Sequence, residues 1–528
     1  MAGTAAPAAA AGRTGRIVVT LREDAPPRAV AARTGVTRAA PAIPRLRAIV
    51  VRPAGGAGLR AALARLRADP RVLRAEPESR FELRYEPDDP ALAAAEPDAG
   101  AAAGTTLQWY VRRHGFPRAW EHARGRGATV AVIDTGVDGG HPDLAGKVDR
   151  ALDFDDDSSA PATEDADGHG THVASLACAG TDNDIGIAGA GFDCRLIVIR
   201  SDLTDSSVAR GIVAAADAGA HALNMSFGDD GGTHSQIVED AIAYAVARDV
   251  VLVAAAADEP VEEQGEPANL LQPTGTGPDI AAGRGLSVTA AQMDDRRATF
   301  AGRGSQISLA AYGALRSTPT GARGLFALYP RATTPRERPT LVPPSVGCDC
   351  RATLDGESHY AFLPGTSMAA PQVAAAAALV GRLNPDLSGL EVVRILKRAA
   401  RRPAGTGWDP ELGWGILDAG AAVGAARRVD RRPPTSRATA RRRGRTLVVR
   451  WRGRDPAPAP LVASGIRRYE LHRSVGGRPY RRIASTRRRS LRQRLRPGRA
   501  YAYATAAVDR AGNREPLPAR PDVRVRGR

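Results

Sequence analysis

Short apolar strands alternate with helical segments through the middle of this chain, from residue 106 to residue 428. The predicted strands are 128–133, 195–200, 221–226, 250–256, 286–290 and 307–311, and the predicted helices are 206–218, 235–248, 370–383 and 389–400. Strands that are apolar on both faces and separated by helices indicate a parallel sheet that helices cover on both sides. In such an α/β fold, functional side chains gather at the carboxyl ends of the strands.

Two further segments flank this α/β region. Residues 15–85 predict a small α+β domain of βαββαβ order, and its predicted elements are strands at 16–21, 46–51, 72–76 and 80–83 and a helix at 58–68. Residues 86–105 are acidic, rich in Ala and contain Pro, which predicts an exposed linker. Residues 435–528 contain short alternating strands with turn residues between them, which predicts an all-β sandwich.

The composition excludes several classes of protein. No stretch has the roughly 18 continuous apolar residues of a membrane helix. The N-terminal segment MAGTAAPAAAAGRTGR has neither a basic region nor a strongly apolar core, so it is not a convincing signal peptide. The 4 cysteines are too few for a disulfide-built scaffold and lack zinc-ligand spacing.

The net charge of +17 is unevenly distributed along the chain. Residues 427–528 contain 31 Arg, no Lys and 6 acidic residues, a net charge of +25, so the rest of the chain carries −8. Two interpretations remain open. The Arg content reflects codon bias across the whole chain, or the basic segment binds an anionic polymer or a cell-envelope surface.

Three stretches of the α/β region each place a polar residue among small ones at the boundary of a core element. They are AVIDTGVDGGHPDL with Asp134 after a strand, DADGHGTHVA with His169 at the start of a helix, and LPGTSMAAPQVAAAAAL with Ser367 at the start of another. Each alone has an ordinary explanation: an Asp that caps a turn, a His169–His172 metal pair, or a helix N-cap.

Together, the three side chains supply the parts of a nucleophilic site. A serine hydroxyl is a poor nucleophile unless a base takes its proton; the base is usually His, and a buried carboxylate fixes the tautomer of that His. Gly365 lets a substrate backbone approach closely, and the free amides at the helix N-terminus point toward Ser367.

The three stretches closely resemble the catalytic blocks of the subtilisin-like serine peptidases, the subtilases, in that family's order of Asp, His and Ser. The resemblance implies a subtilisin-like doubly wound parallel sheet, with Ser367 as nucleophile, His169 as general base and then acid, and Asp134 as orienting carboxylate. It also implies a substrate-binding cleft with a first specificity pocket that accepts a large uncharged side chain. The implied cleft residues are Ser226, Phe227, Gly228, Ala254, Ala255 and Ala256.

Asp258 departs from the family pattern. By the resemblance, VLVAAAADEP corresponds to a block of alanines followed by Gly-Asn-Glu-Gly, and Asp258 occupies the position of the Asn that donates to the oxyanion. An ionised carboxylate cannot donate and repels developing negative charge. Three alternatives remain: Asp258 is protonated and donates, the backbone N–H of Ser367 acts alone, or another amide such as Asn269 takes this position.

The flanking segments also resemble known modules. The stretch LRADPRVLRAEPESRFEL resembles the inhibitory propeptide of subtilases, which implies self-cleavage between Tyr85 and Thr106. The C-terminal segment, with Trp451, Tyr501 and Tyr503, resembles a fibronectin type III module.

These observations predict a secreted serine endopeptidase made as a self-processing zymogen, whose partners are polypeptide substrates and its own propeptide. One alternative is a pseudo-peptidase or binding protein whose catalysis Asp258 weakens, and another is that the C-terminal module is the functional part. No cofactor is expected. The acidic stretch DFDDDSSAPATEDADG is either a solvated loop or a calcium site without regular ligand spacing.

The cysteine positions predict one disulfide in an exported protein. Cys178 ends the helix that His169 begins, and Cys194 precedes the next strand, so these two are expected to pair. Cys348 and Cys350 are expected to be too close to pair comfortably with each other.

Overall fold

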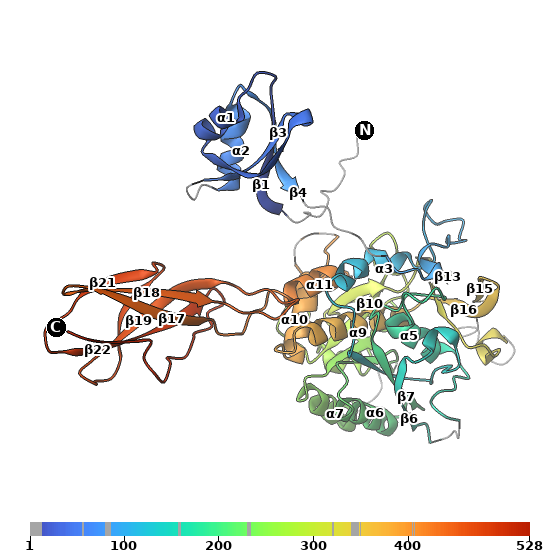
Figure 1. Cartoon of the computed structure of the whole chain (residues 1–528). Coiled ribbons are helices and arrows are strands. Elements are labelled where there is room, and N and C mark those ends of the chain that lie inside the picture. Colours follow the sequence, from blue (N-terminus) through green and yellow to red (C-terminus); the bar gives the residue numbers. More distant parts are fainter. Residues whose placement is uncertain are drawn as a thin grey trace. The chain divides into compact units, whose positions relative to one another are not determined.

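The computed structural model describes residues 13–54, 58–79, 86–156, 160–229, 234–318, 321–338, 348, 350–403, 405 and 407–527. The chain divides into two compact units, Met1–Tyr85 and Glu86–Arg528, which are described separately (Figure 1). Among the described residues, no helix has the length and apolar character that crossing a membrane requires.

The first unit is a four-stranded antiparallel sheet with two helices. Its strand order is β2-β3-β1-β4, and Ile17, Val30 and Leu66 belong to its buried core. The elements are β1 (Arg13–Leu21), α1 (Pro27–Thr34), β2 (Val36–Ile43), β3 (Ala48–Pro53), α2 (Leu59–Ala68) and β4 (Val72–Ser79). The sequence pattern located β1, β3, α2 and β4 but not α1 and β2. The predicted strand 80–83 lies outside the described residues.

A seven-stranded parallel sheet forms the centre of the second unit. The strand order is β11-β10-β9-β8-β5-β7-β6, and all six neighbouring pairs are parallel. The strands are β5 (Thr129–Asp134), β6 (Val148–Phe154), β7 (Arg195–Ser201), β8 (Ala222–Met225), β9 (Val251–Ala255), β10 (Leu286–Ala291) and β11 (Leu309–Tyr312).

Helices cover both faces of this sheet (Figure 1). Successive residues of β5 belong to opposite cores: Val132 packs with α5 and α9, whereas Ile133 packs with α6 and α7. The helices are α3 (Trp109–Arg113), α4 (Phe116–Trp120), α5 (His169–Cys178), α6 (Asp205–Asp217), α7 (Gln236–Val246), α8 (Ala268–Leu271), α9 (Thr366–Leu383), α10 (Gly389–Ala399) and α11 (Ala419–Ala426). The predicted doubly wound parallel sheet is therefore confirmed.

The six predicted strands and four predicted helices of this unit are present, with ends displaced by a few residues. The sequence analysis missed β6 because its sequence, VDRALDF, is polar and partly exposed, as an edge strand bonded to β7 alone allows. Helix α9 begins at Thr366, earlier than the predicted residue 370. The prediction placed the start too late because the apolar helical pattern begins only after Thr366 and Ser367.

The chain between β11 and α9 forms a small antiparallel sheet that the sequence analysis did not predict. Its order is β14-β16-β15, and β12 and β13 form a separate hairpin. Phe326 and Tyr360 stack within the main core at a centroid distance of 5.2 Å. The strands are β12 (Arg316–Thr318), β13 (Gly321–Arg323), β14 (Leu325–Leu328), β15 (Arg351–Leu354) and β16 (Glu357–Leu363).

Residues 86–105 belong to the second unit and are partly buried there, so the prediction of a wholly exposed linker is wrong in part. Ala91 and Leu92, in the short 3-10 helix η2 (Pro90–Leu92), are buried in the main core. The buried carboxylate of Asp89 accepts a hydrogen bond from the backbone N of Asp182 at 2.9 Å. Composition alone could not show that these groups find partners elsewhere on the fold.

The C-terminal region is a two-sheet β module, as predicted. One antiparallel sheet has the order β17-β18-β21 and the other β20-β19-β22-β23. Trp451, Leu471 and Tyr503 are buried in one core that both sheets share. The strands are β17 (Thr435–Arg443), β18 (Thr446–Arg454), β19 (Ile466–Val475), β20 (Arg481–Thr486), β21 (Ser490–Arg494), β22 (Ala500–Asp509) and β23 (Val523–Arg526).

All four cysteines form disulfides. Cys178 at the end of α5 pairs with Cys194, as predicted, and both are buried. Cys348 also pairs with Cys350, so the expectation that these two do not pair is wrong. Their Cα atoms are 5.0 Å apart, within the range that a disulfide bridges.

Candidate active site

Asp134 and His169 come together where β5 ends and α5 begins. Asp134 is the last residue of β5 and is buried, and His169 is the first residue of α5. Asp134 Oδ1 lies 2.8 Å from His169 Nδ1 and also accepts a hydrogen bond from the backbone N of Thr135 at 2.9 Å. A carboxylate acceptor at Nδ1 keeps the proton on that nitrogen and leaves a lone pair on Nε2. This is the tautomer that a general base requires.

The groups around His169 set its pKa. Burial by itself lowers the pKa of His169, but the charge and the hydrogen bond of Asp134 outweigh burial, so the pKa lies above its ordinary value. Arg336 lowers this pKa and Asp167 raises it through their charges. Because a base acts in its neutral form, chemistry that uses His169 as a base is lost as the pH falls through this raised pKa.

Ser367 lies at the start of α9, next to the end of β8. Ser367 Oγ donates a hydrogen bond to Ser226 O at 3.0 Å, and Ser226 Oγ donates to Ser367 O at 2.9 Å. Within the described residues, Ser226 O is the only hydrogen-bond partner of Ser367 Oγ, so the hydroxyl does not bond to His169 in this state. Such bonds are often absent until a substrate is bound.

Asp258 lies beside the start of α9. Its Oδ1 accepts hydrogen bonds from Thr366 N at 2.8 Å and Thr366 Oγ1 at 2.9 Å, whereas its Oδ2 would lie 3.1 Å from a Cβ added at Gly365. Asp258 therefore contacts Thr366, the residue that precedes Ser367 at the start of α9. The alternative residue, Asn269, belongs to a different helix, α8.

The pKa of the Asp258 carboxyl is raised. The residue as a whole keeps exposed surface, but the surrounding protein desolvates the carboxyl group, and this raises its pKa. The hydrogen bonds from Thr366 and the charge of His169 act in the opposite direction.

The predicted cleft residues have different surroundings. Ser226 and Phe227 line a cavity of about 180 Å³ together with Asp134 and His169. Ala256 O accepts a hydrogen bond from Thr366 Oγ1 at 2.6 Å, which places it beside α9. Ala254 and Ala255 belong to β9 and are buried. Gly228 lies near Glu266, since a Cβ added at Gly228 would be 3.5 Å from Glu266 O. The described cavity therefore contains two of the six predicted residues.

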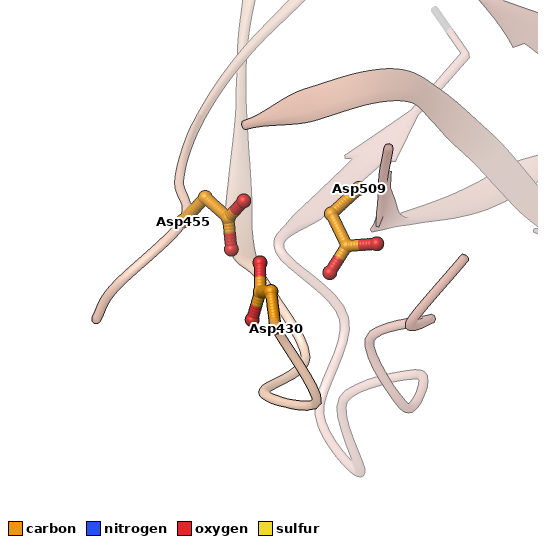
Figure 2. Close-up of side chains that lie close together, drawn as sticks. All are labelled: Asp430, Asp455 and Asp509. Atoms are coloured by element: carbon orange, nitrogen blue, oxygen red, sulfur yellow. The ribbon is translucent and has the colours of Figure 1, made fainter. Parts of the chain in front are cut away.

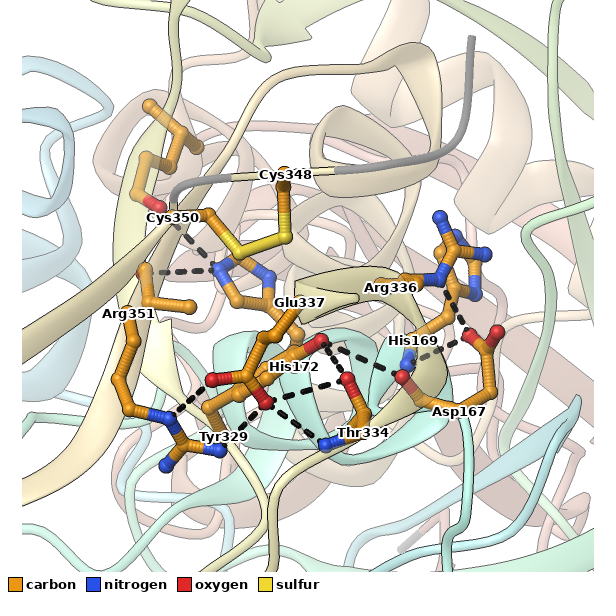
Figure 3. The surroundings of a disulfide bond; sticks show 12 residues. Asp167, His169, His172, Tyr329, Thr334, Arg336, Glu337, Cys348, Cys350 and Arg351 are labelled. Carbon is orange, nitrogen blue, oxygen red and sulfur yellow. Dashed lines mark hydrogen bonds and ion pairs between the residues drawn. A yellow bond between two sulfur atoms is a disulfide. The ribbon is translucent and has the colours of Figure 1, made fainter. Parts of the chain in front are cut away.

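Arg336, which the sequence analysis did not single out, reaches the same cavity. It belongs to the 3-10 helix η4 (Pro335–Glu337). Arg336 Nε donates to Asp167 Oδ1 at 2.7 Å, and the same oxygen accepts a hydrogen bond from His169 N at 3.1 Å (Figure 3). No motif marks Arg336, because 169 positions separate it from Asp167 and only the path of the chain brings the two together.

The acidic stretch before His169 is largely paired within the protein. Asp155 pairs with Arg200 at 2.8 Å, and Asp165 Oδ2 accepts a hydrogen bond from Thr171 Oγ1 at 2.6 Å. Hydrogen bonds from Thr171 and Gly168 lower the pKa of Asp165, but burial outweighs them and raises it. These pairs favour the loop interpretation of this stretch over a cation site.

Elsewhere in the second unit, three carboxylates lie close enough together to bind the same cation. Oxygens of Asp430, Asp455 and Asp509 lie within 4.8 Å of one another (Figure 2). Each carboxylate also accepts at least one hydrogen bond from a backbone amide of the C-terminal region. The cluster thus connects Asp430, which follows α11, to the β module.

Comparison with protein families identifies one family for this chain. The sequence profile of the subtilase family matches residues 125–415, which include Asp134, His169 and Ser367. Thermitase of Thermoactinomyces vulgaris is 32% identical over 298 residues, which cover 55% of this chain and 87% of that protein. The thermophilic serine proteinase of Bacillus sp. strain AK1 is 32% identical over 295 residues, covering 55% of this chain and 60% of that protein. A solved structure of proteases from Pseudoalteromonas arctica is 27% identical, with a TM-score of 0.48, and covers 61% of this chain and 97% of that one.

Gly170 makes the contact between α5 and the end of β5 possible. A Cβ at this position would lie 2.1 Å from Gly136 O and 3.1 Å from Asp134 Oδ1. We expect Gly170→Ala to lower the thermal unfolding midpoint, because overpacking of this kind costs about 1–3 kcal/mol. Gly381→Ala is the control, since a Cβ added there in α9 meets no atom within 4 Å and should stabilise the helix by up to about 1 kcal/mol. Equal midpoints for the two variants would contradict the close contact.

Proposed function

This chain belongs to the subtilase family of serine endopeptidases, and from that premise we propose that Asp134, His169 and Ser367 form its catalytic triad. The observation that carries the proposal is the 2.8 Å contact between Asp134 and His169 beside the start of α9. Ser367 attacks the scissile carbonyl while His169 Nε2 takes its proton and later gives it to the leaving amine. Asp134 stabilises the imidazolium that forms. Family membership favours this enzyme over a pseudo-peptidase.

Substrate binding prepares the serine for attack. In the free protein, Ser226 O accepts the hydrogen bond of Ser367 Oγ. A substrate backbone that adds as a strand along residues 226–228 offers its own N–H to Ser226 O and replaces that bond. The released hydroxyl then turns to His169 Nε2. Ser226, Phe227 and Gly228 thus bind the substrate, with residues 254–256 as the other wall of the first specificity pocket.

Asp258 and the backbone N–H of Ser367 form the oxyanion hole in this proposal. The Asp258 carboxyl donates to the oxyanion only when it is protonated, and its raised pKa favours that state. Once ionised, it repels the oxyanion and leaves the Ser367 N–H as the remaining donor. We therefore propose an active but impaired peptidase that works relatively better at mildly acidic pH.

The chain is made as a zymogen in this proposal, with the first unit as the inhibitory propeptide. Residues 86–105 are bonded into the second unit through Asp89 and Asp182, so they remain with the mature enzyme. The processing cut therefore falls near Tyr85, at the boundary of the two units. A zymogen of this design keeps the peptidase inactive until export, which agrees with the two disulfides of the chain.

One observation favours a second activity, the binding of anionic polymers by the β module. Four exposed arginines, with Ile466 and Tyr469, line a cavity of about 410 Å³. These are Arg467, Arg487, Arg489 and Arg510. None of the four forms an ion pair with another described residue. Converging guanidinium groups without acidic partners suit a phosphate-bearing polymer.

We expect Ser367→Ala to abolish peptide hydrolysis and to leave the chain uncut, since one nucleophile performs both reactions. The loss of rate should be on the order of 10⁶-fold. The readouts are turnover of a peptide substrate and the N-terminal sequence of the purified protein, which should begin near Glu86 in the parent. If purified Ser367→Ala still loses its first unit, self-processing by Ser367 is wrong.

Asp258→Asn should raise kcat at neutral pH by tens-fold or more and flatten the preference for acidic pH. Asn keeps an oxygen to accept from Thr366 N and gains an amide donor for the oxyanion, and one such donor is worth about 3 kcal/mol. Asp258→Ala is the matched control, because it removes the charge without adding a donor. An Asp258→Asn enzyme no faster than its parent at pH 8 would mean that this carboxylate does not face the oxyanion.

The full chain should bind a phosphate-polymer column and elute as salt rises, because such binding releases counterions. Replacing the four cavity arginines by Gln should shift elution to lower salt. The control replaces four exposed arginines of the other sheet, an equal change in charge: Arg437, Arg441, Arg450 and Arg492. If both sets shift elution equally, the cavity is not the binding site and only the overall charge matters.

A further inference from the structure

The cavity beside His169 is placed to receive a substrate side chain. Its walls belong to five parts of the fold: the end of β5, the start of α5, the segments after β7 and after β8, and the short helix η4. The wall residues are Asp134, Thr135, His169, Leu203, Ser226, Phe227 and Arg336. With about 180 Å³, the cavity suits one side chain of a residue close to the scissile bond.

Arg336 is the one wall residue that is cationic at every working pH. Its Nε donates to Asp167, and within the described residues neither Nη atom of Arg336 has a hydrogen-bond partner. The side chain is 24% exposed, whereas Asp167 is not part of the cavity wall. The cavity therefore borders Arg336, whose two Nη atoms are free to bind a ligand, and not the carboxylate that holds its Nε.

The segment around Arg336 is fixed by its own contacts (Figure 3). Thr334 N donates to Glu337 Oε2 at 2.7 Å, and Glu337 also pairs with Arg351. Arg336 O accepts a hydrogen bond from Cys348 N at 2.8 Å, next to the Cys348–Cys350 disulfide. A guanidinium held in this way loses little conformational entropy when it binds a ligand.

The acidic group in the wall does not cancel this charge. Asp134 Oδ1 is occupied by His169 Nδ1 and Thr135 N, and Asp134 Oδ2 has no exposed area. A carboxylate that enters the cavity finds unpaired donors on Arg336, whereas one oxygen of Asp134 is bonded and the other is buried. Charge-assisted hydrogen bonds from guanidinium to carboxylate are about twice as strong as neutral ones.

We propose that Arg336 makes this peptidase select a substrate with Asp or Glu at the position whose side chain enters this cavity. The inference rests on the proposed active site and adds its substrate class. Arg336 belongs to the segment between β14 and β15, which no sequence motif marks.

The test compares kcat/KM for peptide pairs that differ only by Glu against Gln at one of the residues preceding the cleaved bond. The parent should prefer Glu at one position by on the order of tenfold. Arg336→Gln should remove that preference, so that its kcat/KM values for the Glu peptide and the Gln peptide become equal. Asp167→Asn should increase the preference, because it frees the guanidinium and keeps an oxygen that accepts from His169 N.

Arg331→Gln is the matched control. Arg331 lies in the same segment and pairs with Asp138, but it does not line the cavity, so its loss should leave the Glu preference unchanged. Arg336→Lys keeps the charge and should retain part of the preference, which keeps the test valid if Arg336→Gln fails to fold. A second readout is the acid limb of the pH profile, which should move to higher pH in Arg336→Gln, since Arg336 lowers the pKa of His169.

A Glu preference that persists in both Arg336 variants, or that is absent from the parent, overturns the proposal. Failure of the proposed active site has a different outcome: Ser367→Ala would then still cleave the Gln peptide. The same peptides therefore distinguish a failure of the Arg336 proposal from a failure of the proposed active site.

Discussion

The burial of the central sheet on both faces is the constraint from which the site follows. Val132 and Ile133, neighbours in β5, enter different cores, so polar side chains have no place within the strand. Asp134 is the first residue that leaves this double burial, and it does so where α5 and α9 begin. Helix N-termini bring free amides and the positive end of the helix dipole to the same edge. The sheet thus concentrates the polar groups at one end.

The charged groups of the site make opposing demands on pH. In the proposed mechanism, His169 acts as a base only when it is neutral, and its raised pKa favours activity at higher pH. Asp258 donates to the oxyanion in this mechanism only when it is protonated, and its raised pKa favours activity at lower pH. Arg336 lowers the pKa of His169 and so widens the range in which both conditions hold. The proposed enzyme is therefore one in which surrounding charges partly compensate for a carboxylate at the oxyanion position.

The sequence predicted those parts of the fold whose pattern is local. The strand that ends at Asp134 and the helix that begins at His169 were predicted because each lies within a short, distinctive stretch. Strand β6 was missed because an edge strand need not be apolar, and Arg336 because only tertiary contacts bring it to Asp167. The burial of Ala91 and Leu92 was missed for the same reason, since an Ala-rich acidic segment gives no sign of the surface it contacts.

The central claim is that Ser367, activated by His169 and oriented with Asp134, is the nucleophile. The most direct measurement is the rate and position of labelling by a fluorophosphonate probe, mapped by mass spectrometry of the processed chain. The account predicts rapid, single labelling at Ser367 that becomes slow in Asp134→Asn, because the wrong tautomer of His169 no longer accepts the serine proton. Labelling at another residue, or a rate in Asp134→Asn equal to that of the parent, would contradict it.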